Sequence, residues 1–262
     1  MAHRLIVDVW DYNLRDEFLE LTAVLTHYRV LAVDTEFPGF LKATPRNASP
    51  SALFMDVLVN VTPTQLIQLG ITLLDFEGNI YYKTWQFNFS FSEKYDKCSP
   101  KAIEFLRTAA KIDFDKLSSN GINIVLFAKM LSGVVNCHRG YDGMPMLKWI
   151  TFHGVYDIAH AMKMLEGNCL PQDIASFTAA IFYDFGFVLD LKQMINVCPN
   201  LEVPKVGLAS LAEMLDVARI GTSHQAGSDS LLTAMVYKSL IQTYPIEEFF
   251  FYGSLYGLHL YK

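Results

Sequence analysis

Apolar and polar residues recur with two different periods in the first forty positions. Residues 12–27 predict an amphipathic helix, because their leucine and phenylalanine residues are three to four positions apart. Residues 30–37 (VLAVDTEF) are short, β-branched and mostly apolar, a pattern typical of a buried central strand. Pro38 and Gly39 end this strand.

Two apolar segments joined by a tight turn predict a β-hairpin. The segments are 66–75 and 80–89, with the turn at Glu77-Gly78-Asn79. Together with 30–37, they give an antiparallel three-stranded meander. Residues 40–63 contain three prolines and are expected to be mostly irregular.

The second half of the chain is mostly helical in pattern, with one more strand predicted at 147–153. Helices are expected over roughly 99–135, and at 156–165, 171–183, 190–197, 207–217, 225–242 and 246–252. Strands that alternate with helices favour an α/β sheet surrounded by helices. The sequence has no repeat, low-complexity tract or linker, so we expect a single domain over residues 1–262.

Composition and charge limit the classes of function. Hydrophobic residues make up 52% of the 262 residues and charged residues 18%, enough apolar material for a substantial core. The net charge of −6 and the pI near 5.6 argue against a protein that binds nucleic acid over many phosphates. They allow an enzyme that holds a few nucleotides at a carboxylate-rich site, where bound divalent cations invert the local field.

The four cysteines do not predict a zinc site or a disulfide framework. Cys98, Cys137, Cys169 and Cys198 are far apart and form no CxxC pair, so reduced thiols in an intracellular protein are expected. The N-terminus reaches charged residues too soon for a signal peptide, and no stretch of about 18 apolar residues could span a bilayer. We therefore expect a soluble protein with no membrane partner.

Two carboxylates lie near the end of the first predicted strand. Residues i and i+2 of a strand project from the same face, so Asp34 and Glu36 would be neighbours. Burying two like charges is costly unless a cation compensates them. The alternative is a strand end that pairs with a nearby lysine or arginine.

Two later acidic residues and a histidine have ordinary explanations when they are taken singly. Asp157 begins a predicted helix, where an aspartate often caps free backbone N–H groups. Asp229 lies in the first turn of another helix, where the helix dipole favours an anion. His224, five residues before Asp229, would then be merely exposed.

Taken together, these residues match the needs of two-metal phosphodiester hydrolysis. Four carboxylates at the ends of different elements offer the hard oxygen ligands that two Mg²⁺ or Mn²⁺ ions about 4 Å apart require. A histidine whose pKa is near neutral can take a proton from the attacking water. The combination therefore favours a nuclease over any of the single explanations.

The motifs Asp34-Thr-Glu-Phe-Pro-Gly39 and His224-Gln-Ala-Gly-Ser-Asp229, with Asp157 between them, resemble those of the Caf/Pop deadenylase family. Blocks at 9–14, 66–70, 84–89 and 256–258 also resemble this family and lie in order along the chain. The family belongs to the DEDD nucleases, in the variant with a general-base histidine five residues before the last aspartate.

This resemblance implies a ribonuclease-H-like α/β fold, with a mixed sheet surrounded by helices. It implies five catalytic residues, with Asp34, Glu36, Asp157 and Asp229 as metal ligands and His224 as the general base. It also places His153 and Lys192 near the catalytic cleft, where they would bind substrate. The alternatives are that His153 is a core histidine and that Lys192 lies on the surface.

The sequence departs from the family pattern just before the third carboxylate. The family commonly reads Phe-His-Ser-Gly-Tyr-Asp, whereas this chain has Gly154 and Val155 in place of serine and glycine. The β-branched Val155 restricts the backbone there, so the approach of substrate or the aim of Asp157 is expected to change. The tyrosine often found before Asp190 is Leu189. These changes are expected to affect the rate of the reaction rather than its type.

The function implied by the resemblance is a 3′→5′ exoribonuclease that shortens mRNA poly(A) tails and releases AMP. Its partners would be RNA, a Not scaffold subunit and a leucine-rich-repeat deadenylase subunit, in the cytoplasm and nucleus. One alternative is a weakly active or non-catalytic adaptor in a Ccr–Not-like complex, although retention of all five catalytic residues argues against it. Another is an exonuclease that acts on structured RNA or DNA.

Overall fold

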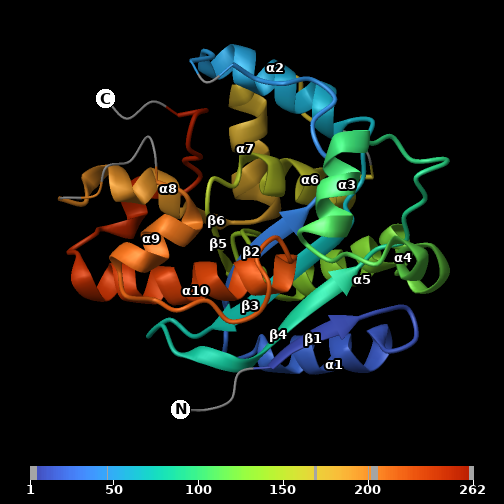
Figure 1. Ribbon diagram of the computed structural model, residues 1–262. Helices are drawn as coiled ribbons and strands as arrows, with labels where there is room; N and C mark the ends of the chain where they lie inside the picture. Colours follow the sequence, from blue (N-terminus) through green and yellow to red (C-terminus); the bar gives the residue numbers. More distant parts are fainter. Residues whose placement is uncertain (1–4, 46, 168–169, 200, 202–205, 260–262) are drawn as a thin grey trace.

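In the computed structural model, which describes residues 5–45, 47–167, 170–199, 201 and 206–259, the strands form one mixed sheet (Figure 1). The strands of the described residues are β1 (Leu5–Val9), β2 (Val30–Glu36), β3 (Gln68–Leu74), β4 (Ile80–Asn88), β5 (Lys148–Thr151) and β6 (Phe187–Asp190). Their order is β1-β4-β3-β2-β5-β6, and β3 alone runs antiparallel to its neighbours. The meander of β2, β3 and β4 is therefore as the sequence predicts.

Helices cover both faces of the sheet (Figure 1). On one face are α1 (Leu14–Val24), α2 (Pro50–Val61), α5 (Ile124–Cys137), α6 (Val155–Leu165) and α7 (Ile174–Asp184). On the other are α8 (Leu191–Met194), η1 (Ile195–Val197), α9 (Leu208–Met214), α10 (Ala226–Thr243) and η3 (Glu248–Phe251). The short helices α3 (Pro100–Thr108) and α4 (Phe114–Asn120) enclose a smaller apolar cluster with Trp10. The layered α/β architecture agrees with the expected fold class.

Side chains of β2 point alternately to the two faces of the sheet. Leu31 and Val33 belong to the core beneath α1, α5 and α6, whereas Val30 and Ala32 pack beneath α10. By the same alternation the next two even-numbered residues, Asp34 and Glu36, continue the α10 face. Thr35 between them turns toward α6. One strand therefore serves both layers at its carboxyl end.

The prediction that residues 40–63 are mostly irregular was wrong, because α2 occupies Pro50–Val61. Ser49 caps this helix, since its hydroxyl accepts a hydrogen bond from the Ala52 N–H at 3.2 Å. Pro50 fits the first helical position, where its missing N–H is not needed. One of the three prolines that suggested a loop, Pro50, therefore marks a helix start.

The short outer strands were also absent from the prediction. β1 pairs in parallel with β4, and β6 pairs in parallel with β5. The helix expected at 190–197 starts at Leu191, directly after β6.

No helix within the described parts of the chain is both long and apolar enough to cross a bilayer. Of the four cysteines, Cys169 lies outside the described residues.

Candidate metal centre

The first two acidic residues lie where β2 ends on the α10 face. Asp34 is opposite Gly70 of β3, and Glu36 is opposite Gln68. Burial raises the pKa of Asp34 well above its usual value, and the negative charges of Asp157 and Asp229 raise it further. Burial and these same two carboxylates also raise the pKa of Glu36. The carboxylates are therefore close enough to repel one another.

Asp157, the third residue of α6, reaches the same place from the opposite layer. Its Oδ1 accepts hydrogen bonds from the Thr35 backbone N–H at 2.9 Å and from the Thr35 hydroxyl at 2.5 Å. Burial raises the pKa of Asp157 to about 7, although the Thr35 bonds act in the opposite direction. The interpretation of Asp157 as a helix cap was wrong, because Gly154 is the N-cap of α6 and its start has no side-chain cap.

The start of α10 lies directly on the sheet because Gly70 has no side chain. A Cβ at this position would lie 1.9 Å from the carbonyl oxygen of Ala226. The Gln225 side-chain oxygen accepts hydrogen bonds from Gln68 Nε2 at 3.2 Å and Gln86 Nε2 at 2.6 Å. The Gly227 N–H donates to Gln86 Oε1 at 2.8 Å. These amide contacts fix the register of α10 over β3 and β4.

This docking brings Asp229 and His224 to the carboxylates of β2. The Asp229 carboxylate Oδ2 accepts a hydrogen bond from the His224 backbone N–H at 2.9 Å. Glu36, His224 and Asp229 each offer one metal-binding atom, and these atoms lie within 4.8 Å of one another. His224 has a left-handed backbone, with φ of 62°, and its ring contacts Phe105 edge-on at 5.0 Å between centroids. Its side chain therefore reaches the carboxylates while remaining exposed.

Arg219 is a residue of the site that sequence reasoning missed. Its guanidinium forms an ion pair with the Asp229 carboxylate, and Nη1 also lies 3.1 Å from the Ser228 hydroxyl oxygen. Its positive charge lowers the pKa of Asp34, against the four influences that raise it. The only signal in the sequence was a basic residue five positions before His224.

His153 and Lys192, the two proposed substrate-binding residues, lie together. The His153 ring packs edge-on against Tyr256 at 5.2 Å, and Lys192 Nζ lies 4.9 Å from the centroid of the same tyrosine ring. Lys192 is buried, so its interpretation as a surface residue was wrong, and burial lowers its pKa. His153 is exposed rather than a core histidine.

Asp190 is a second residue that sequence reasoning missed, and it joins this group to the start of α6. Its buried carboxylate accepts backbone N–H hydrogen bonds of 2.7–3.1 Å, from His153, Gly154, Lys192 and Tyr256. A carboxylate satisfied in this way holds three remote segments in one arrangement. It therefore positions the loop that leads to Asp157.

Gly154 and Val155, where the sequence departs from the family pattern, are closely packed. Val155 is buried in the core on the α6 side of the sheet. A Cβ on Gly154 would lie 2.0 Å from the Thr151 hydroxyl oxygen, so glycine fits this position beside threonine. Two residues further on, Asp157 accepts both of its hydrogen bonds from Thr35.

The arrangement fits divalent cations. Four carboxylates converge from β2, α6 and α10, and among the described residues the ion pair with Arg219 is the one salt bridge that any of them makes. Burial, and then repulsion between the carboxylates, raise the pKa values of Asp34 and Glu36, so the cluster is short of positive charge. Hard oxygen donors of this kind suit Mg²⁺ or Mn²⁺.

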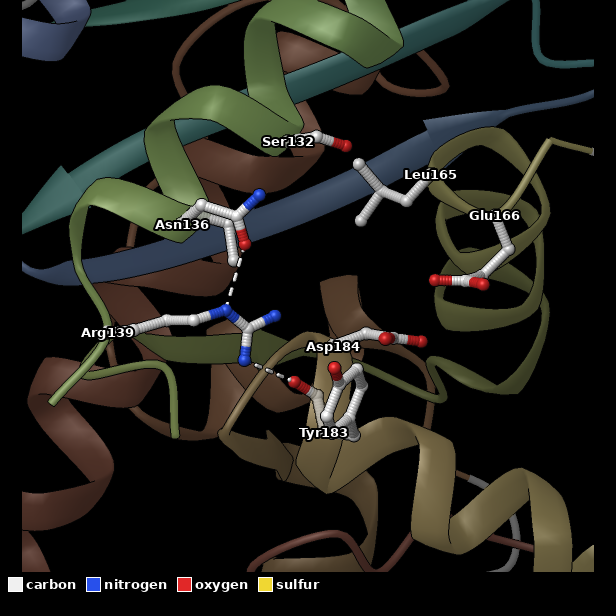
Figure 2. A pocket seen from close by; sticks show the side chains of 8 residues that line it. Ser132, Asn136, Arg139, Leu165, Glu166, Tyr183 and Asp184 are labelled. Carbon is white, nitrogen blue, oxygen red and sulfur yellow. Dashed lines mark hydrogen bonds between the residues drawn. The ribbon is translucent and has the colours of Figure 1, made fainter. Parts of the chain in front are cut away.

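A separate cavity of about 230 Å³ lies between α5, α6 and α7, and none of the four carboxylates lines it (Figure 2). Arg139 is anchored beside it by hydrogen bonds to Asn136 and the Tyr183 carbonyl (Figure 2). Asp184 has a buried carboxylate oxygen with no hydrogen-bond partner. Burial and the neighbouring Glu166 raise the pKa of Asp184 to about 6.

Comparisons with known proteins show similarity to a family of ribonucleases. A family model described as CAF1 family ribonuclease matches residues 9–127. The Arabidopsis thaliana protein named probable CCR4-associated factor 1 homolog 5 is 38% identical over 236 residues, which cover 89% of this chain and 81% of that protein.

Solved structures show the same likeness. S. pombe Pop2p in a Mg²⁺- and Mn²⁺-bound form is 33% identical, with a TM-score of 0.86 over 97% of this chain and 99% of that chain. Yeast CAF1 with the NOT1 MIF4G domain gives 25% identity, a TM-score of 0.79 and 96% coverage of each chain. A 3′-exonuclease that recognises the histone mRNA stem-loop gives 14% identity, a TM-score of 0.52 and 83% coverage of each chain, and shares the fold alone.

Proposed function

The chain belongs to the CAF1 family of ribonucleases, and we propose that it is a metal-dependent 3′→5′ exoribonuclease that shortens mRNA poly(A) tails and releases AMP. The observation that carries this proposal is the convergence of four carboxylates from β2, α6 and α10 with His224, which lies just before α10. Residues 1–262 would act as one DEDD-type exonuclease domain.

Asp34, Glu36, Asp157 and Asp229 are the proposed ligands of two divalent ions, Mg²⁺ or Mn²⁺. The related S. pombe Pop2p was solved with these two metals, which supports the choice. When bound, such ions polarise the phosphodiester and make water more acidic. Thr35 holds the carboxylate of Asp157 through two hydrogen bonds, so that ligand is oriented before any ion arrives.

His224 is the proposed general base, which takes a proton from the attacking water on a ring nitrogen. Its exposed position beside Glu36 and Asp229 leaves that nitrogen open to water. His153 and Lys192 would contact the RNA, with the Lys192 ammonium offsetting phosphate charge and the rings of His153 and Tyr256 available to a base.

The proposed partners follow from the relatives. Yeast CAF1 was crystallised with the NOT1 MIF4G domain, so we propose a Not scaffold as a partner of this chain. A leucine-rich-repeat deadenylase subunit and the mRNA tail complete the proposed assembly, which would act in the cytoplasm and nucleus. The acidic composition suits a short RNA footprint.

The direct test is hydrolysis of a 5′-labelled RNA that ends in a run of adenosines. The purified protein should shorten this RNA stepwise from its 3′ end with Mg²⁺ or Mn²⁺, release AMP and stop when EDTA is added. RNAs of equal length that end in uridines or cytidines measure the preference for adenosine, and Asp34→Ala protein is the control for contaminating nuclease. A folded protein with no activity in either metal would contradict the proposal and favour a non-catalytic adaptor.

A further inference from the structure

Arg219 occupies one oxygen of a proposed metal ligand. Its guanidinium is paired with Asp229 Oδ1, while the His224 backbone N–H donates to Oδ2 at 2.9 Å. Both carboxylate oxygens therefore already have a partner in this arrangement. A cation that approached Oδ1 would meet the guanidinium at the same atom.

No other cationic side chain forms a salt bridge with any of the four carboxylates in the described parts of the chain. The positive charge of Arg219 also lowers the pKa of Asp34, so Arg219 compensates more than one acidic residue. In the absence of divalent ions, this compensation makes the convergence of four like charges less costly.

The guanidinium and divalent ions are unfavourable neighbours, because positive charges repel at short distance in a partly buried site. The Arg219 side chain is 23% exposed and lies in the exposed segment that precedes His224, so it has a route to solvent. Ser228 keeps a second partner when Arg219 leaves, since its hydroxyl donates to the Ile220 carbonyl at 2.8 Å.

We propose that Arg219 is a positioning residue that exchanges with the divalent ions at Asp229. It holds this carboxylate in place while the site is free of metal, and it gives up the carboxylate when the ions bind. The inference rests on the proposed function, because it requires that Asp229 be a metal ligand. Arg219 therefore competes with the divalent ions for Asp229 and lowers the affinity of the site for metal.

Calorimetric titration of Mn²⁺ into metal-free protein tests this exchange without any measurement of activity. Arg219→Gln should bind Mn²⁺ roughly tenfold more tightly than wild type, the low end of what a charge-assisted hydrogen bond contributes. Arg219→Lys retains the charge and should stay close to wild type. Arg15→Gln, an exposed position on α1, makes the same change in net charge and should leave the affinity unchanged.

Thermal melting supplies the second measurement. Metal-free Arg219→Gln should melt below wild type, because the carboxylates lose their counter-charge. Saturating Mn²⁺ should raise the Tm of this variant by more than it raises the Tm of wild type. Equal or weaker Mn²⁺ binding by Arg219→Gln, with normal binding by wild type, would overturn the exchange and leave the proposed function standing. Absence of Mn²⁺ binding by wild type would overturn both.

Discussion

Three consecutive residues at the end of β2 divide their roles between the two layers of the molecule. Asp34 and Glu36 face Asp229 in the first turn of α10 and His224 just before this helix, while Thr35 faces α6 and binds Asp157. Strand alternation alone sends these side chains in opposite directions. The tripeptide Asp-Thr-Glu thus contacts residues from the helical layers on both faces of the sheet.

Replacing a proposed ligand should remove activity without unfolding the protein. Loss of a residue that only hydrogen-bonds to a metal ligand typically lowers activity about 10–100-fold. Asp34→Asn changes a proposed ligand itself, so it should lower nuclease activity by more than this. Its metal-free Tm should equal or exceed that of wild type, because the burial and repulsion that raise the pKa of Asp34 are relieved. Activity on labelled RNA and thermal melts would be measured together. A variant that is inactive only because it unfolds would remove the support for a ligand role.

His224→Ala distinguishes a general base from a metal ligand. If His224 takes the proton, single-turnover rates should fall by about 10²–10⁴-fold between pH 6 and 9, while Mn²⁺ affinity stays near wild type. A ring nitrogen of His224 is within 4.8 Å of ligand oxygens of Glu36 and Asp229, so direct metal ligation is the competing role. Weaker Mn²⁺ binding would indicate that role. Unchanged rates across the pH range would contradict both.

At the scale of elements, the site depends on how α10 meets the sheet. The helix starts against Gly70, and the amides of Gln68 and Gln86 hold Gln225 over β3 and β4. These contacts join residues more than 130 positions apart in the chain. The geometry of Asp229 is therefore set by packing between elements rather than by its own helix.

Gly70→Ala tests this dependence. The added Cβ would lie 1.9 Å from the Ala226 carbonyl oxygen, so α10 must shift, and overpacking of this kind costs typically about 1–3 kcal/mol. Chemical denaturation should show that loss, and nuclease activity should fall because Asp229 moves. Gly133→Ala is the matched control, because nothing lies within 4 Å of its added Cβ in α5. It should stabilise the helix by roughly 0.5–1 kcal/mol and leave activity unchanged.

Elements with local signals were predictable from the sequence, and those without were not. The hairpin of β3 and β4 is marked by two apolar segments with a glycine turn between them, and its pairing with β2 follows from proximity in the chain. β1 and β6 are short, and their parallel partners are remote, so no local pattern marks them. Pro50 suggested a loop because its meaning depends on Ser49 as the cap.

The same distinction applies to the site. The proposed ligands and His224 belong to motifs that resemble a known family, so their proximity could be anticipated. Arg219, Thr35 and Asp190 could not, because each acts through a contact that folding creates. Thr35 meets Asp157 across 122 positions, and Asp190 accepts from the Tyr256 N–H across 66.

At the scale of the whole molecule, buried acids make stability depend on pH outside the site as well. Asp184 lies beside the cavity of Figure 2 with one unpartnered oxygen, and its pKa is raised from 3.8 to about 6, mainly by burial and then by Glu166. The folded protein therefore keeps this proton to higher pH than the unfolded chain does. The contribution of Asp184 to stability is full below pH 4 and is lost as the pH rises through 6.

Asp184→Asn should remove this dependence. Relative to wild type, the free energy of unfolding of the variant should increase from pH 4 to pH 7 and then level off, as measured by urea denaturation. Glu166→Gln should show a weaker form of the same trend, because Glu166 contributes to the raised pKa of Asp184. A difference between Asp184→Asn and wild type that is independent of pH would contradict this account of Asp184.

The carboxylates of β2, α6 and α10 are proposed to form one divalent-metal site. Anomalous diffraction from crystals of the protein grown with Mn²⁺ tests it most directly, because the signal locates the ions independently of any activity. Two peaks are expected about 4 Å apart, within about 2.5 Å of oxygens of Asp34, Glu36, Asp157 and Asp229. Crystals of Asp34→Asn should lose at least one of these peaks. Mn²⁺ peaks elsewhere, with none beside these four residues, would show that these carboxylates do not form the metal site.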